Sequence, residues 1–136
     1  MANAVFTSFK VALLKADCDL DDSIKFVFVD HADDTPVPAT DDFLDDIGAP
    51  ARVATSGALA NKTFTAGVFD ADDNVVSAVT GDTFESIVFF DDTPGTEATK
   101  DLILYLDTAT GLPTTPNGAD ITVVFDSGAN KIFSLG

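Results

Sequence analysis

The stretch GLPTTPNGADITVVFDSGANKIFSL, residues 111–135, carries the clearest structural pattern in the chain. From Ile121 to Asp126 apolar residues alternate with more polar ones, as in a strand with one strongly apolar face. Residues 127–130, Ser-Gly-Ala-Asn, are typical of a turn, because Gly and Asn readily adopt positive φ. We therefore expect a closing β-hairpin in which residues 131–135 return beside residues 121–126.

Apolar runs bounded by turn residues also occur upstream. Five runs, FVFVD, GVFD, VFFD, LYLD and VVFD, end in Asp, a residue that readily begins a turn. Short strands at close spacing are typical of antiparallel sandwiches, jelly rolls and barrels. The predicted upstream strands cover residues 24–30, 52–58, 63–70, 75–80, 83–91 and 100–107.

One segment favours a helix. Between Val5 and Ala16, the apolar residues recur at three- and four-residue spacing, which predicts a short amphipathic helix. A chain of 136 residues is long enough for one core and too short for two. We therefore predict one domain over residues 1–136, mainly β, an antiparallel sandwich or jelly-roll-like fold with one short N-terminal helix.

The composition excludes several classes of partner. The net charge is -16, and only Glu85 and Glu97 among the 23 acidic residues are Glu, which favours turns over helices. Seven Lys and Arg residues are too few for a patch that neutralises phosphates, so we expect no direct nucleic-acid binding. We expect neither a signal peptide nor a membrane span. Cys18 is the single cysteine, so no intrachain disulfide forms and we expect a small buried residue.

No residue set matches a catalytic site, so we expect no catalytic residues. The single histidine, His31, precedes Asp33 and Asp34, but no Ser or Cys stands in a recognisable nucleophile motif. We interpret His31 as an exposed loop residue. Glu85 is the one acid with apolar neighbours, and strand alternation would point it outward.

Calcium binding is the strongest alternative for the acidic residues. Asp70, Asp72 and Asn74 have the spacing of the first EF-hand ligands, but Val75 and Gly81 occupy the positions that need Gly and Glu. The run from Asp17 to Phe28 fails in the same way. We therefore predict no metal site and no cofactor, with a cation held between loops as the alternative.

Twelve Phe are more than a small core readily covers, which favours a subunit interface. The alternative is that the helix and the sheet cover one another. The long loop at residues 31–50 is a second candidate contact surface, anchored by Phe43, Leu44 and Ile47. The candidate interface residues are Phe6, Phe9, Leu13, Phe26, Phe28, Phe43, Leu44, Phe89 and Phe90.

The order of these segments resembles a family of small structural proteins from the virions of tailed bacteriophages. The similarity covers nearly the whole chain and is most specific in LPTTPNGADITVVFDSGANKIF. Members of the family often carry Trp at the position of Phe125. The resemblance implies a non-enzymatic β-rich protein that self-associates and attaches to a larger viral assembly.

The charge favours one location on such an assembly. A chain at -16 inside a capsid would repel packaged DNA, whereas the outer surface tolerates this charge. We therefore expect a capsid decoration, or cement, protein, made in the host cytoplasm, that forms a homotrimer on the outside of the head and stabilises contacts between major capsid protein subunits. The alternative is a tail-associated structural module or one that binds a host receptor or glycan.

Overall fold

A computed structural model describes residues 2–135 as a mainly β, antiparallel fold with one α-helix. No helix within these residues combines the length and hydropathy needed to cross a bilayer. In chain order the elements are β1 (Ala4–Val5), α1 (Thr7–Lys15), β2 (Ile24–Val29), β3 (Arg52–Thr55), β4 (Val68–Phe69), β5 (Asn74–Val76), β6 (Ser86–Asp91), β7 (Leu102–Leu106), β8 (Ile121–Val123) and β9 (Phe133–Ser134), with short 3-10 turns at Leu44–Asp46, Ala49–Ala51, Thr65–Gly67 and Glu97–Thr99.

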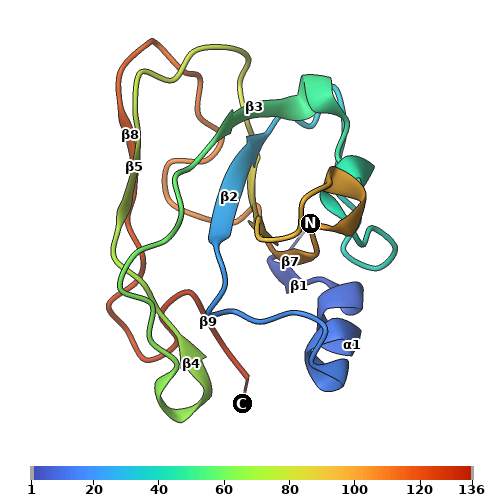
Figure 1. Ribbon diagram of the computed structural model, residues 1–136. Helices are drawn as coiled ribbons and strands as arrows, with labels where there is room; N and C mark the ends of the chain where they lie inside the picture. The colour runs from blue at the N-terminus through green and yellow to red at the C-terminus, as the bar shows by residue number, and fades with distance from the viewer. Residues whose placement is uncertain (1, 136) are drawn as a thin grey trace.

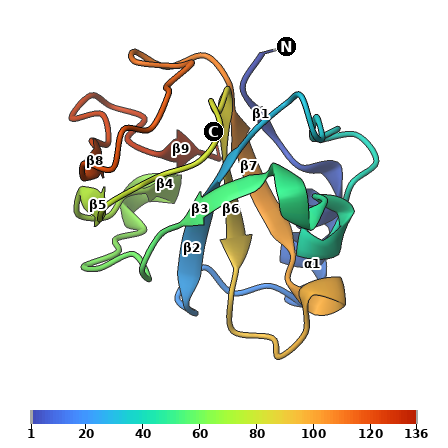
Figure 2. The same ribbon diagram turned by 90° about the horizontal axis from the view of Figure 1, so that it is seen from above.

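The strands form one five-stranded sheet and two small ribbons. The sheet has the order β1-β7-β6-β2-β3, and the ribbons pair β4 with β9 and β5 with β8. Figure 1 shows the β5–β8 ribbon standing beside the sheet. Seen from above, the sheet lies between the two ribbons on one side and α1 with the following loops on the other (Figure 2). Both faces of the sheet are therefore covered by the same chain.

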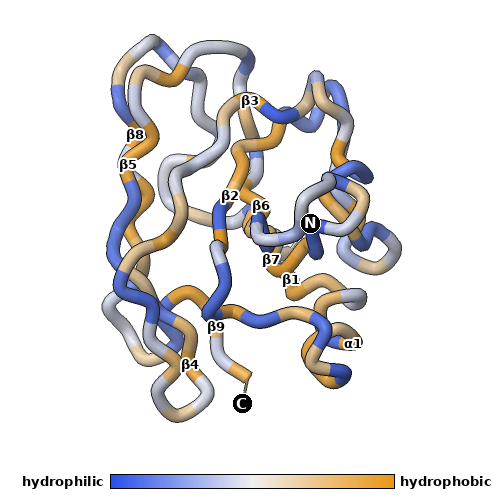
Figure 3. The backbone as a smooth tube through the Cα atoms, in the orientation of Figure 1, coloured by the Kyte–Doolittle hydropathy of each residue, from blue (hydrophilic) through white to orange (hydrophobic). Residues whose placement is uncertain are grey.

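The centre of the sheet is apolar on both faces. Phe26 pairs with Phe89 and Phe28 with Ile87, and because side chains alternate along a strand, these four share the face toward the ribbons. Every residue of β6 is buried, and five of the six in β2 are buried. Figure 3 shows apolar residues gathered in the central strands, with hydrophilic residues recurring in the connecting loops. The core therefore forms around β2 and β6.

Helix α1 packs against the sheet beside β7. Phe6 and Phe9 are fully buried, and the Phe6 backbone N–H donates to the Ile103 carbonyl at 3.0 Å. The helix ends at Ala16, which adopts the left-handed conformation with φ 59°. Its position confirms the predicted helix, with bounds a residue or two inside those expected.

The predicted C-terminal hairpin is wrong. β8 pairs with β5, and β9 pairs with β4, so the two segments at residues 121–126 and 131–135 join different ribbons. Lys131 adopts a positive φ of 50°, which turns the chain away from β8. Both ribbons are thus formed by strands far apart in the sequence rather than by a local hairpin turn.

Several predicted strands are shorter than expected. Residues 63–70 contain only the two-residue β4, because Ala66 and Gly67 both adopt positive φ and break the extended run. The pairing of β3 ends at Thr55. Residues 40–44 also predict a helical turn with Thr40 as its cap. The observed 3-10 turn begins instead at Leu44, where the Asp46 carboxylate accepts the backbone N–H groups of Asp42 and Phe43.

The nine candidate interface residues lie largely inside one chain. Phe43 and Leu13 are half-buried. The helix and the sheet cover one another. The ribbons and α1 cover the Phe side chains, so the number of Phe residues does not by itself require a subunit interface. A contact between copies would have to use residues other than the seven buried ones. The seven buried residues are Phe6, Phe9, Phe26, Phe28, Leu44, Phe89 and Phe90.

Replacing Phe89 by Ala should destabilise the fold strongly. Phe89 is 1% exposed and its ring centroid lies 5.5 Å from that of Phe26, so the substitution leaves a cavity worth about 3–5 kcal/mol of unfolding free energy. Urea denaturation measures this loss. Phe64→Ala is the matched control: Phe64 is 43% exposed, and we expect a loss of about 1 kcal/mol or less. Equal losses for the two variants would contradict the assignment of the core.

Candidate functional site

His31 is not the exposed loop residue that the sequence predicts. It is half-buried at the end of β2, and its Nε2 lies 2.9 Å from the Ser86 hydroxyl and 3.4 Å from the Tyr105 hydroxyl. The Tyr105 hydroxyl also donates to Asp107 at 3.2 Å. Burial and the nearby Asp107 carboxylate raise the pKa of Tyr105 to about 12, so it remains a hydrogen-bond donor.

The distance between His31 and Ser86 is that of a catalytic Ser-His pair, but the serine hydroxyl is not accessible. Ser86 is fully buried in β6, so a substrate cannot reach its hydroxyl in the folded chain. The Glu85 carboxylate accepts the His31 backbone N–H at 2.9 Å and fixes the start of the loop. The arrangement ties the ends of β2, β6 and β7 together, which is a structural role.

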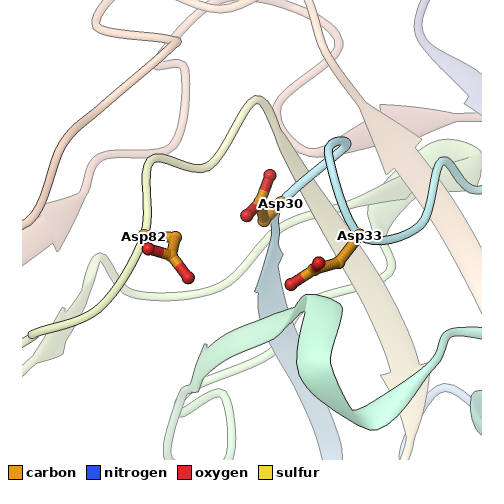
Figure 4. Close-up of side chains that lie close together, drawn as sticks. All are labelled: Asp30, Asp33 and Asp82. Atoms are coloured by element: carbon orange, nitrogen blue, oxygen red, sulfur yellow. The ribbon is translucent and has the colours of Figure 1, made fainter.

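A second cluster brings three carboxylates together. One carboxylate oxygen each from Asp30, Asp33 and Asp82 lie within 4.8 Å of one another. Figure 4 shows Asp30 at the end of β2, Asp33 in the loop that follows and Asp82 in the segment before β6. Asp30 is buried and its Oδ1 already accepts the Ala32 backbone N–H at 2.7 Å. The geometry brings together one oxygen from each carboxylate, and three ligands are fewer than the six to eight that calcium takes.

The residues with EF-hand spacing lie elsewhere and have separate partners. Asp72 accepts a hydrogen bond from the Asn61 side chain at 2.5 Å, and Asp73 accepts the Phe125 backbone N–H at 2.8 Å. Asp19 accepts the Asp21 backbone N–H at 2.9 Å. These carboxylates hold turns and join β5 to the segment after β8.

Cys18 is a buried residue, as predicted. It is 4% exposed and its Sγ lies 3.8 Å from Asp91 Oδ2. Burial and the carboxylate of Asp91 raise the pKa of the Cys18 thiol to about 12, so the thiolate needed for nucleophilic attack does not form near neutral pH.

A groove with a volume of about 490 Å³ lies between the β5–β8 ribbon and the central sheet. The sheet side contributes Phe28, Phe84 and Ile87, and the Phe28 and Phe84 rings stack with centroids 4.2 Å apart. The opposite sides come from residues 109–112 with Thr114, and from residues 121–124 with Asp126. The groove is therefore largely apolar, with one acidic residue in its lining.

Hydrogen bonds hold both sides of this groove in place. Phe84 and Thr114 exchange backbone N–H and carbonyl bonds, each of 3.0 Å, which fix the 109–114 loop to the start of β6. On the other side, the Ala78 backbone N–H donates to Asp120 Oδ1 at 2.9 Å, and Val79 bonds to both Ala119 and Gly118. The fold therefore fixes the positions of both sides of the groove.

One edge of β8 faces away from its partner strand. β8 pairs only with β5 within residues 2–135. The Phe125 N–H points toward the β5 side, where it bonds to Asp73. β8 ends at Val123, but exposed Thr122 and Val124 continue to alternate with half-buried Val123 and Phe125, as in an extended run. Because N–H and C=O directions alternate along such a run, we infer that those of Thr122 and Val124 point to the opposite edge. Both residues line the groove, so the free edge of β8 borders an apolar recess.

The sequence pattern gives part of this site. The alternation from Ile121 onward predicts a strand, and the Pro and Gly residues between Gly111 and Gly118 indicate a shaped loop beside it. The pattern does not show that this strand would be at an edge, because the predicted hairpin partner would have covered it. No protein-family model matches the chain, and no curated protein matches it significantly.

We expect no specific calcium site in the Asp30, Asp33 and Asp82 cluster. Calcium chloride should raise the thermal midpoint no more than sodium chloride of equal ionic strength, because any salt screens a chain at -16. Differential scanning fluorimetry checks this. A saturable rise specific to calcium, lost in Asp82→Asn, would contradict the expectation.

Proposed function

We propose that this protein is a capsid decoration, or cement, protein of a tailed bacteriophage. It would bind the outside of the head and stabilise contacts between major capsid protein subunits. The observation that carries the proposal is the open edge of β8 over an apolar groove on an otherwise self-covered fold. Such an edge suits attachment to another polypeptide, and the family resemblance of the surrounding sequence supplies the assembly.

The balance between core and surface also supports an attachment role. Apolar strands are buried within one chain, and the surface carries the acidic residues that give a net charge of -16. A self-contained fold of this kind can be added to a finished shell without unfolding, and its acidity suits the exterior, away from packaged DNA. The five-stranded sheet and the two ribbons would then form an open sandwich.

Exposed apolar residues supply a surface for self-association. Leu14 on α1 is 89% exposed, and Phe64 and Leu135, which line one shallow depression, are 43% and 57% exposed. Phe64 also lines a second depression with Leu13. Figure 1 places α1, β4 and β9 at the same end of the molecule. This end is our proposed contact between copies in a homotrimer.

Virions with and without this protein test the proposal. We expect densitometry of purified particles to give a copy number of the same order as that of the major capsid protein. Particles that lack the protein should release DNA at a lower temperature than complete ones. When the salt is diluted stepwise, they should also release it earlier, at a higher remaining ionic strength, because added contacts hold neighbouring subunits together. Re-addition of the purified protein should restore the loss.

Two outcomes would contradict it. A handful of copies per particle, confined to the tail, would favour the tail-associated or host-recognition alternative. If complete particles carry the protein at full occupancy and stripped particles resist heat equally well, the cementing role is contradicted.

A further inference from the structure

We infer that the free edge of β8 and the groove beside it bind an extended, cationic segment of another polypeptide by β-strand addition. The inference deepens the proposed function and rests on it only for the identity of the partner, which would be a segment of the major capsid protein. The binding chemistry itself rests on the backbone, the groove lining and the charge.

The backbone supplies the first part of the recognition. By alternation along the extended run, the N–H and C=O groups of Thr122 in β8 and of Val124, the residue after it, point away from β5, toward the groove edge. Unpaired groups in a row on a strand edge are a template for another strand. An added strand would pair with these groups without disturbing the ladder between β5 and β8.

The groove supplies the second part. Successive side chains of an added strand point to opposite faces, so every second one would enter the recess beside Phe28, Phe84 and Ile87. These three residues are apolar and line the sheet side of the recess. A volume of about 490 Å³ accommodates apolar side chains from a short segment. The bound segment should therefore place apolar residues at alternate positions.

The charge selects among possible occupants. The groove lining contains no cationic residue and includes Asp126, and Asp120 directly precedes β8. A second copy of this chain docked at the same edge would bring its own Asp126 close to this one. Like charges at a docked edge oppose association, whereas Lys or Arg at the outward positions of a bound strand would be attracted. We therefore assign the groove to a cationic partner.

A synthetic peptide that alternates valine and lysine, blocked at both ends, is the probe. We expect saturable binding by fluorescence anisotropy, with the backbone amide resonances of Thr122 and Val124 shifted in NMR spectra and protected from exchange. The same peptide with N-methyl groups on alternate residues keeps its charge but loses strand pairing, and should bind about tenfold or more weakly. A valine and glutamate peptide should not bind measurably.

Val124→Lys and Val75→Lys form a matched pair of variants. Val124 directly follows β8 and is 70% exposed, Val75 lies in β5 and is 53% exposed, and both substitutions change the net charge equally. Only Val124 lines the groove. We expect Val124→Lys to weaken peptide binding about tenfold or more and Val75→Lys to change it about twofold or less.

Three results would overturn the inference. Equal binding of the N-methylated and unmodified peptides would show simple ionic attraction, and equal effects of the two variants would place the site elsewhere. Concentration-dependent self-association that Val124→Lys abolishes would assign the groove to a second copy. Peptide binding by a protein absent from virions would instead refute the proposed function and leave the groove assignment intact.

Discussion

The fold depends on one constraint, which is that the paired strands β2 and β6 are apolar on both faces and must be covered on both. Phe26 and Phe89 pair on one face, and Val27 and Val88 pair on the other. A two-sided apolar sheet cannot border water on either side, so the rest of the chain is arranged as two covers. Helix α1 and the loop at residues 31–51 form one cover, and the ribbons form the other (Figure 2).

The ribbons cover their face of the sheet incompletely, and the groove lies where the cover is missing. Each ribbon has only two strands, so neither closes its edges, and Phe125 reaches the sheet with its ring centroid 6.0 Å from that of Phe89. Beyond this contact, the ribbon stands away from Phe28 and Ile87 along the β8 edge. The need to cover the sheet and the capacity to bind another strand thus arise from the same element.

The parts of the fold that depend on local pattern could be predicted from the sequence. Helix α1 and strands β2, β6 and β7 have strong periodicity or long apolar runs, and each formed close to its predicted bounds. The pairing of β8 could not be predicted, because the turn residues 127–130 suggest a local hairpin and the true partner, β5, lies 45 residues upstream. The Phe residues were assigned to an interface for a related reason, since composition does not show which loops return to cover them.

The candidate site shows the same division. The acidic turn at Asp30 and Asp33 is visible in the sequence, but Asp82 joins it only through the pairing of β2 with β6. The Ser86, His31 and Tyr105 cluster likewise joins three strands. Spacing rules for calcium and for nucleophiles act within a short segment, so they pointed to Asp70 and Asp72 rather than to the residues that meet in space.

The account requires that one chain covers its own two-sided sheet. Amide hydrogen exchange at high and at low micromolar protein concentration tests this most directly. The account predicts that the amides of β2, β6 and β7 exchange slowest and at rates independent of concentration, because their burial is complete within a single copy. Exchange in these strands that accelerates on dilution would show that a neighbouring subunit covers them, and would contradict it.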